Sequence, residues 1–138
     1  LIIVTTPAVS AQKVAIRAAD MARRSFLRIA GVIENMSAFT CEHGTTYPLF
    51  GAGGGQNLAT EIGSELLGQI PIESDVSHGS DNGEPVAIAG AGIAAEVFRD
   101  IAKKIIQQTV PVNEMAGCSA RMLESVALAL GEKPAKIN

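Results

Sequence analysis

The first 33 residues read LIIVTTPAVSAQKVAIRAADMARRSFLRIAGVI, a pattern that predicts a strand, a helix and a second strand. Residues 1–4 are continuously apolar, as expected for a strand that is buried on both faces of a sheet. Ser10 is the predicted N-cap of a helix that runs to about Arg24, and residues 27–33 form the second strand. Strand, helix and strand in so short a stretch make a βαβ unit with parallel strands and a right-handed crossover. The predicted fold class is therefore α/β.

The middle of the chain continues this alternation with weaker signals. Residues 35–48 show no period and predict a long loop. A glycine-rich turn at residues 51–55 leads into a helix near Leu58. A short third strand covers residues 67–70 and is closed by Pro71.

The last third of the chain combines a turn-rich segment with helices. Residues 73–85 carry turn residues without periodicity, and an amphipathic helix follows from about 91 to 108. Residues 111–138 form a tail with one short predicted helix. The apolar stripes that should face the core are Val14, Ala18, Met21 and Ala22 on the first long helix, and Ile93, Val97, Ile101 and Ile105 on the last.

Composition excludes several classes of function. The 138 residues carry 11 Lys and Arg against 14 Asp and Glu, so the net charge of −3 offers no basic surface for nucleic acid or anionic lipid. Hydrophobic residues make up 47% and charged residues 18%, which predicts a folded core. No apolar run approaches the ~20 residues of a membrane span. Because the chain begins inside a predicted core strand, we expect it to be a piece of a longer protein.

The two cysteines, Cys41 and Cys118, lie far apart in the sequence. So few cysteines argue against a disulfide scaffold and favour a cytoplasmic protein. Cys41 and His43 are soft ligands that suit zinc or iron–sulfur chemistry, but two ligands need a partner chain or another loop to complete a site. An exposed thiol beside a loop histidine is the alternative. Cys118 is expected to be a small core residue.

The glycine-rich turn at residues 51–55 has two interpretations. Bare N–H groups at a helix N-terminus attract phosphate. However, Gln56-Asn57 stands where a P-loop would carry Gly-Lys-Ser/Thr. Taken alone, the turn is better explained as a place where the helix and the preceding loop pack closely.

Two further polar groups have both a functional and a structural interpretation. Asn35 ends the second predicted strand, where α/β sheets bind ligands, and its amide suits a purine edge. Taken alone, an asparagine that starts a turn is the simpler explanation. No nucleophile-elbow glycines flank either serine of a possible Ser-His-Asp set, so side chains that bond their own turn are favoured there. That set comprises Ser74, Asp75, Ser77, His78 and Asp81.

Several segments occur in a fixed order between residue 1 and about residue 108. They are Val4-Thr5-Thr6-Pro7, Gly31-Val32-Ile33-Glu34-Asn35-Met36-Ser37, Phe50-Gly51-Ala52-Gly53-Gly54-Gly55, Leu58-Ala59, Leu67-Gly68-Gln69-Ile70-Pro71-Ile72 and Asp81-Asn82-Gly83-Glu84-Pro85-Val86. This combination resembles the C-terminal half of an Mrp-type P-loop ATPase. That family belongs with the MinD and ParA ATPases and contains iron–sulfur cluster carriers. The resemblance implies that residues 1–110 are the C-terminal part of a doubly wound parallel-sheet NTPase domain, followed by a helical tail at 111–138.

The resemblance also implies functional residues. Asn35 and Pro71 would flank the adenine of ATP, and the residues beside that wall would be Ile70, Ile72 and Glu73. The loop that carries Cys41 corresponds to the CPxC loop of the family, where paired cysteines of two protomers hold a bridging iron–sulfur cluster. Here the loop reads Cys41-Glu42-His43-Gly44, without the second cysteine and the proline. A homodimer would therefore offer two Cys41 thiolates, with His43 as a further ligand.

The function implied by the resemblance is that of a cytoplasmic, dimeric, ATP-binding carrier that delivers iron–sulfur clusters to apo-proteins. In this family the Walker A lysine and the Walker B aspartate lie upstream, together with their Mg²⁺. Neither occurs in these 138 residues, so we expect no ATP hydrolysis by this chain alone. One alternative is a non-catalytic nucleotide-binding or interaction module of the same fold that has lost the cluster site. A MinD-like positioning ATPase is less favoured, because the tail helix carries only Arg121 and Glu124 as charges.

Overall fold

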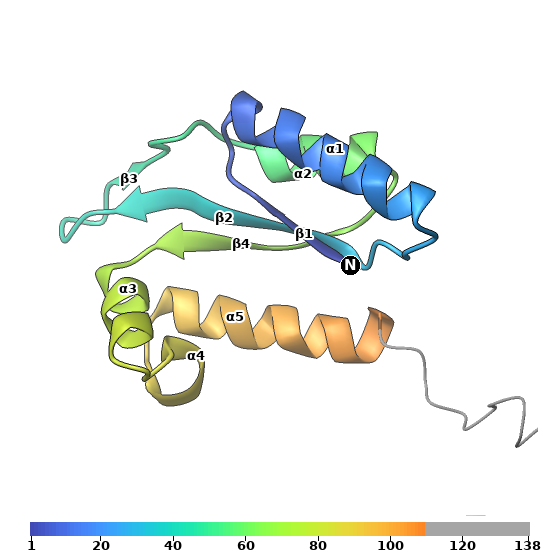
Figure 1. Cartoon of the computed structure of the whole chain (residues 1–138). Helices are drawn as coiled ribbons and strands as arrows, with labels where there is room; N and C mark the ends of the chain where they lie inside the picture. The colour runs from blue at the N-terminus through green and yellow to red at the C-terminus, as the bar shows by residue number, and fades with distance from the viewer. Residues whose placement is uncertain (110–138) are drawn as a thin grey trace, which may run out of the picture.

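Three parallel strands form the centre of the computed structural model, which describes residues 1–109 (Figure 1). Strand β2 (Gly31–Thr40) lies between β1 (Ile2–Thr5) and β4 (Leu66–Ile72) and runs parallel to both. The short β3 (Thr46–Tyr47) returns antiparallel along the end of β2. The α/β class and the parallel pairing of the first two predicted strands are confirmed.

Helices cover both faces of this sheet (Figure 1). Helices α1 (Val9–Arg24) and α2 (Gly54–Glu61) lie on one face, and α5 (Ile93–Lys104) lies on the other. Between β4 and α5 the chain forms α3 (Ser74–Asp81) and α4 (Val86–Ala89). Helix α5 continues directly into a π-helical turn, η1, at Ile105–Thr109.

Each face of the sheet has its own hydrophobic core, because apolar side chains on the two sides of a sheet must be covered separately. Small alanines on α1 allow that helix to approach β1 and β2 closely. The core on the α1 and α2 side consists of Ile3, Ala15, Ala19, Val32, Leu58, Ala59 and Ile62. The core on the α5 side consists of Leu67, Ile70, Ala94 and Ile101.

The predicted loop at residues 35–48 is wrong. Strand β2 continues through Thr40 and turns back into β3, so most of this stretch is a β-hairpin. A regular strand shows apolar and polar residues in alternation. The register shift between Asn35 and Phe39 makes this part of β2 irregular, so its sequence lacks that alternation. At its other end β2 begins at Gly31, later than predicted, because residues 25–27 close the C-terminus of α1.

The turn-rich interpretation of residues 73–85 is also wrong for most of its length, because α3 occupies Ser74–Asp81. Helix α3 has no buried residue, and only Val76 packs against the α5-side core. So short and exposed a helix produces almost no hydrophobic period in the sequence. A turn does follow it, at Gly83 with a φ of 73°.

The expectation that β1 is buried on both faces is wrong for the described residues. Ile3 and Thr5 are buried, whereas Ile2 is 36% exposed and Val4 is 58% exposed. The sequence pattern is that of a strand with two covered faces, but residues 1–109 cover only one of them.

The predicted helix stripes are partly wrong. On α1 the buried residues are Ala15, Ala19 and Ala22, while Val14 and Met21 of the predicted stripe are exposed. On α5 the side chain of Ile93 is exposed, and the buried residues are Ala94, Ala95 and Ile101. Alanine is only weakly hydrophobic. The predicted stripes therefore followed larger apolar residues on neighbouring faces of the helices and missed the alanines that make the actual contacts.

The predicted N-cap at Ser10 is wrong as well. Helix α1 begins at Val9, with Ala8 in the N-cap position and no side-chain capping bond. No helix within residues 1–109 is long and apolar enough to span a membrane. The predicted tail helix and Cys118 lie outside the described residues.

Candidate functional site

The middle of β2 and the carboxyl end of β4 bring the predicted nucleotide residues together. Asn35 on β2 is the register partner of Ile70 on β4, and Pro71 and Ile72 follow Ile70 along the strand. Asn35, Pro71 and Ile72 are half-buried. Ligands of open parallel sheets bind beyond this edge, so the arrangement suits a small-molecule site.

The Asn35 side chain is oriented by its own strand. Its Oδ1 atom accepts a hydrogen bond from the backbone N–H of Met36 at 2.9 Å. Met36 has a φ of 56°, a conformation that non-glycine residues seldom adopt, and it lies within the irregular stretch of β2. Because the oxygen is committed to the backbone, the amide NH₂ group is the end that Asn35 can present to an acceptor atom of a ligand.

Ile70 has a different environment from Pro71 and Ile72. Its side chain is 4% exposed and belongs to the core between the sheet and α5. A contact of Ile70 with a ligand would therefore use its backbone. Pro71 and Ile72 are the members of this strand with accessible side chains.

Glu73 stands at the N-cap position of α3 but does not cap it through its side chain. Its Oε1 atom accepts a hydrogen bond from the backbone N–H of Ala94 at 3.1 Å, in the first turn of α5. The carboxylate thus satisfies an N–H group at the positive end of α5. A hollow of about 360 Å³ lies beside it, lined among others by Phe39, Ile72 and Glu73.

Cys41 lies at the tip of the hairpin formed by β2 and β3. Its backbone N–H donates to the carbonyl of Thr45 at 2.9 Å, and the Gly44 N–H donates to the carbonyl of Cys41 at 2.9 Å. Gly44 has a φ of 80°, which closes the short loop without steric cost. The cysteine therefore sits on a defined turn at the edge of the molecule.

Backbone N–H groups surround the Cys41 thiol. The amides of His43 and Thr45 lower the pKa of this thiol below its ordinary value, because both donate to the charged sulfur. A hollow of about 330 Å³ at this tip is lined by Phe39, Cys41, Glu42 and His43. The lowered pKa favours the thiolate, which is the form that binds metal ions and attacks electrophiles.

The Cys41 tip and the strand-end residues share one neighbour. Phe39 lines both the hollow at the tip and the hollow beside Ile72 and Glu73. Its Cα also pairs with Tyr47 on one side and Ile72 on the other. Within residues 1–109 no three potential metal ligands of the His, Cys, Asp or Glu type come together. One copy of this segment thus supplies Cys41 as a single soft ligand with nearby His43.

The residue that the sequence analysis missed is Glu34, whose side chain is only 1% exposed. Its carboxylate accepts hydrogen bonds from the backbone N–H of Gly55 at 2.5 Å and from Nε2 of Gln69 at 2.6 Å. The signal was available, because a lone acidic residue follows Val32 at the two-residue spacing of one strand face.

The glycine turn before α2 therefore matches the packing interpretation. Gly53 occupies the N-cap with a φ of 73°, and a side chain on Gly54 would collide with the backbone of Pro7. A Cβ atom on Gly55 would lie 2.6 Å from Cβ of Glu34. The N–H group of Gly55 is already bound by a protein carboxylate, in the place where a phosphate cradle would offer it to an anion.

The Ser-His-Asp candidates do not form a catalytic arrangement among the contacts of α3. Ser80, a neighbour of this set and not a member of it, donates its hydroxyl to the carbonyl of Val76 at 2.7 Å, within the helix. Ser74 contacts the carboxylate of Asp75 at 3.4 Å. These bonds are local, as the structural interpretation of this stretch predicts.

Comparisons with known proteins agree on the family. Residues 1–106 match the family model described as ParA, NUBPL iron-transfer P-loop NTPase. An iron–sulfur cluster carrier protein of Pyrococcus abyssi is 38% identical over 121 residues, which cover 84% of this chain and 39% of that protein. One of Mycobacterium bovis is 41% identical over 95 residues, covering 64% of this chain and 25% of that protein.

Solved structures show the same fold at lower sequence identity. The MinD cell division protein of Aquifex aeolicus has a TM-score of 0.58 at 20% identity and covers 81% of this chain and 45% of its own. The MinD ATPase of Pyrococcus furiosus has a TM-score of 0.62 at 18% identity and covers 77% and 41%. The chain spans about two fifths of the length of the archaeal relatives that it matches. The sheet, the ordered segments and the family match together show that the chain belongs to the ParA-type, NUBPL-like iron-transfer P-loop NTPases.

Proposed function

We propose that this chain is the nucleotide-end and cluster-loop portion of an ATP-binding iron–sulfur cluster carrier. The observation that carries the proposal is the course of β2. This single strand places Asn35 beside the end of β4 and then continues into the hairpin that presents Cys41. A proposed nucleotide-side group and a thiol are thereby joined by one strand and the turn that follows it.

The nucleotide end fits the edge of a purine base. Asn35 offers its NH₂ group, Pro71 and Ile72 offer half-buried apolar surface, and Glu73 stands beside them with its carboxylate on α5. Purine rings bind between apolar surfaces with one or two directed hydrogen bonds. We assign the adenine-side contacts to Asn35, Pro71, Ile72 and Glu73, and to the backbone of Ile70. The phosphate groups and their Mg²⁺ would be bound by a part of the domain outside these 138 residues.

The cluster end fits a shared site between two copies. Iron–sulfur clusters are held by thiolates, and Cys41 is an accessible thiol whose pKa is lowered. One copy offers too few ligands, so the proposed carrier is a homodimer in which two Cys41 side chains face each other, with His43 beside each. The cluster is cargo that the carrier transfers to apo-proteins.

The remaining expectations follow from this proposal. Residues 1–110 would be the C-terminal half of the NTPase domain, and residues 111–138 a helical extension of it. The protein would act in the cytoplasm, where free thiols stay reduced. Hydrolysis of ATP would need the phosphate-binding part of the domain.

The test is anaerobic reconstitution of the 138-residue chain with iron and sulfide. The proposal predicts visible charge-transfer absorption together with a mass of two chains by light scattering. Cys41→Ser should abolish both, whereas Cys118→Ser is the matched control and should retain both. A chain that stays colourless, or colour that survives Cys41→Ser, would contradict cluster binding at this hairpin.

The second candidate is a nucleotide-binding or interaction module of the same fold that has lost the cluster. The observation in its favour is the loop Cys41-Glu42-His43-Gly44, in which Gly44 occupies a left-handed turn position and a single cysteine remains. Absence of colour in the reconstitution, with nucleotide binding retained, would favour this candidate over the carrier.

A further inference from the structure

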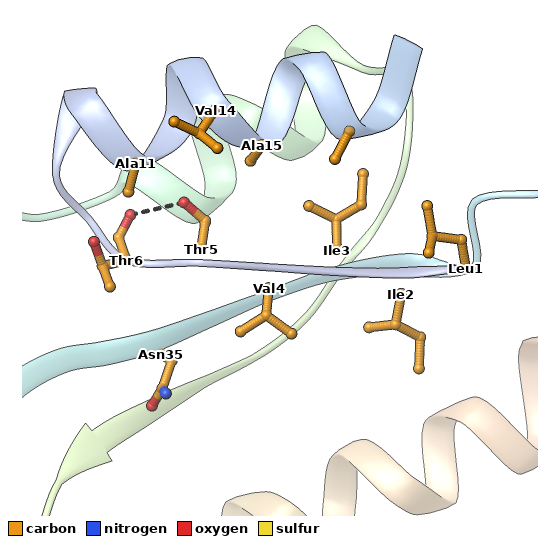
Figure 2. Close-up of a pocket in the computed structure, with 11 residues that line it drawn as sticks. Leu1, Ile2, Ile3, Val4, Thr5, Thr6, Ala11, Val14, Ala15 and Asn35 are labelled. Atoms are coloured by element: carbon orange, nitrogen blue, oxygen red, sulfur yellow. Dashed lines mark hydrogen bonds between the residues drawn. The ribbon is translucent and has the colours of Figure 1, made fainter. Parts of the chain in front are cut away.

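Two surfaces of the described residues each combine several exposed apolar side chains. One is a hollow of about 490 Å³ along β1 and α1, where Val4 and Val14 are exposed (Figure 2). The other lies on the hairpin of β2 and β3 and on the start of α5, where Phe39 is 39%, Tyr47 46% and Ile93 61% exposed. These last three residues are called the hairpin surface below. Exposed apolar groups gathered in this way are typical of sites that bind another molecule.

The hairpin surface is built on a row of apolar residues that crosses three strands. The Cα of Phe39 pairs with Tyr47 on β3 and with Ile72 on β4, and side chains paired in this way project from the same face of a sheet. Ile72 follows Ile70 by two positions, and Ile70 packs toward α5, so the row lies on the α5 face. Ile93 at the start of α5 lines the same hollow of about 360 Å³ as Phe39 and Ile72.

This surface adjoins the Cys41 thiol. Cys41 follows Phe39 by two positions, and both residues line the hollow of about 330 Å³ at the hairpin tip. Pro71 alternates with Ile70 and Ile72, so its side chain projects from the other face of β4. Figure 1 shows the hairpin projecting beyond the helices at this end of the sheet. A molecule bound to the hairpin surface would therefore lie beside the thiol, on the face opposite the Pro71 side chain.

The charges around the hairpin surface have one sign. Residues 29–98 contain no lysine or arginine, whereas acidic residues occur throughout this stretch. Glu42, Glu73 and Asp75 line the two hollows that Phe39 shares. Arg99 is the first cation after this stretch, and its guanidinium donates to two backbone carbonyls of the α4 segment. Acidic groups around exposed apolar side chains attract a partner that is both basic and apolar.

We infer that the hairpin surface binds a basic segment with apolar side chains on the apo-protein that takes the cluster from Cys41. This inference rests on the proposed carrier function and adds the chemistry of the acceptor. A cluster held by Cys41 can pass only to an acceptor whose own ligands come within bonding distance, so the acceptor must contact a surface that adjoins this thiol. A second copy of the chain would bring Glu73 and Asp75 against their own counterparts, which like charges oppose.

The test uses the 138-residue chain with Cys118→Ser and measures how fast Cys41 reacts with short peptides. Each peptide carries one cysteine, activated as a mixed disulfide with nitrothiobenzoate. The Cys41 thiolate attacks the peptide sulfur, the bond to nitrothiobenzoate breaks, and the released thiolate is measured by its absorbance. One peptide alternates lysine with leucine and phenylalanine. A second replaces the lysines with glutamate, and a third replaces the apolar residues with serine.

Binding to the hairpin surface should raise the rate, because it raises the local concentration of the peptide sulfur. We expect the basic apolar peptide to react at least about tenfold faster than either comparison peptide. This advantage should fall when NaCl is raised to about 0.5 M, since salt screens the attraction between charges. Each rate is divided by the rate of iodoacetamide alkylation of the same protein, so a change in the reactivity of the thiol itself cancels.

Two substitutions locate the contact. Ile93→Ser removes an exposed apolar side chain and Asp75→Lys reverses a charge beside the hollow, and each should lower the corrected rate at least about fivefold. The matched controls are Ile88→Ser and Asp81→Lys, which alter exposed residues that line neither hollow and should leave the corrected rate unchanged. Circular dichroism should show the same fold in all four variants.

Equal rates for the three peptides, or an advantage that Ile93→Ser and Asp75→Lys leave unchanged, would overturn the inference. An advantage that AMP abolishes would assign the hollow to the nucleotide. A chain that dimerises through a contact that Ile93→Ser abolishes would make a second copy the occupant. An advantage that arises only after deletion of residues 110–138 would make that segment the occupant.

Failure of this inference can be told apart from failure of the carrier function. A chain that becomes coloured on reconstitution with iron and sulfide but shows no preference for the basic apolar peptide would contradict this inference alone. A chain that stays colourless but prefers that peptide would contradict the carrier function, and the hairpin surface would remain a binding site for basic apolar segments.

Discussion

The carboxylate of Glu34 accepts a hydrogen bond from the backbone N–H of Gly55 at 2.5 Å, which joins the centre of the sheet to the first turn of α2. The second carboxylate oxygen accepts from Nε2 of Gln69 on β4. Glu34 is the residue before Asn35, so the same bonds hold the strand position from which Asn35 projects. A buried carboxylate is tolerated here because two donors and the positive end of a helix satisfy it.

Removal of this carboxylate should destabilise the fold. Glu34→Ala leaves the buried Gly55 N–H without its acceptor and removes the hydrogen bond from the exposed Gln69, and we expect a loss of about 2 kcal/mol in the free energy of unfolding. Urea denaturation followed by circular dichroism measures it. The control is Glu65→Gln, which alters an exposed side chain and should change stability by less than about 0.5 kcal/mol. Equal losses in the two variants would show that Glu34 has no special structural role.

A side chain on Gly55 should be as harmful as loss of its partner. Gly55→Ala places a Cβ atom 2.6 Å from Cβ of Glu34, so we expect a loss of about 1–3 kcal/mol from overpacking, and more if the hydrogen bond breaks. Gly63→Ala is the comparison, because Gly63 has a φ of 62° but open space around it. That variant should lose only the backbone strain, about 1 kcal/mol. Thermal unfolding of both variants measures these losses. A larger loss of stability in Gly63→Ala than in Gly55→Ala would contradict the packing argument.

Phe26 has a backbone conformation that is unfavourable for its residue type. Helix α1 ends with the Leu27 N–H donating to the carbonyl of Ala22 and the Phe26 N–H donating to that of Arg23, which is a Schellman motif. Phe26 takes the left-handed position of that motif, with a φ of 55°, and its side chain is 97% exposed.

Glycine should therefore fit this position better than phenylalanine. We expect Phe26→Gly to stabilise the chain by about 1 kcal/mol, which corresponds to a rise in melting temperature of roughly 3–4 °C. Ser25→Gly serves as the control, because Ser25 has a φ of −92° and gains nothing from glycine. A melting temperature that falls in Phe26→Gly would mean that the exposed ring contributes packing that offsets the strain.

The Cys41 thiol should react as a thiolate at lower pH than an ordinary cysteine. Hydrogen bonds from the backbone amides of His43 and Thr45 lower its pKa in the folded chain only. The linked stabilisation is therefore present above the pKa of the unfolded thiol and is lost as the pH falls through the folded pKa. The rate of iodoacetamide alkylation against pH, measured in a Cys118→Ser background, should have a lower midpoint in the folded chain than in urea.

The His43→Ala variant tests whether the backbone amide or the imidazole of His43 lowers the pKa of Cys41. The variant keeps the amide at position 43, so the midpoint should remain lowered. A midpoint that returns to the value of the unfolded chain would assign the effect to the imidazole side chain.

The adenine-side assignment can be tested on the chain alone with AMP. Saturation-transfer NMR should show magnetisation reaching the purine protons, because Asn35, Pro71 and Ile72 would contact the base. Loss of one directed hydrogen bond in Asn35→Ala should weaken binding about tenfold, the effect of about 1.4 kcal/mol. Asn57→Ala, which alters an exposed residue of α2, is the matched control. Equal transfer in all three proteins would contradict the assignment of Asn35.

Much of the fold was predictable, and the failures have identifiable physical causes. The βαβ unit could be predicted because its strands are rich in β-branched residues and its helix has the right length. The extension of β2 past Asn35 could not be predicted. The irregularity near Met36 interrupts the alternation of apolar and polar residues on which strand prediction depends. Helix α3 was not predicted because an exposed helix without an apolar stripe shows no hydrophobic periodicity in its sequence.

The candidate site divides in the same way. Asn35, Pro71 and Cys41 could be selected from the ordered segments of the sequence. The spacing of Glu34 from Val32 indicates an inward-facing carboxylate, but its partners Gly55 and Gln69 could not be assigned, since they lie 21 and 35 residues away along the chain. Hydrogen bonds over such separations depend on how strands and helices stack, which local sequence patterns do not encode.

The α/β class, the order of the parallel elements and the family follow from the amino-acid sequence alone, because periodicity and ordered segments are local properties of the chain. Which apolar residues lie inside depends on the three-dimensional packing. Val4 and Val14 have the pattern of core residues yet are exposed, whereas Glu34 is charged yet buried. Burial depends on what packs against each side chain. On the outer side of β1 no described residue supplies that cover, and at Glu34 a glycine turn and a glutamine amide do.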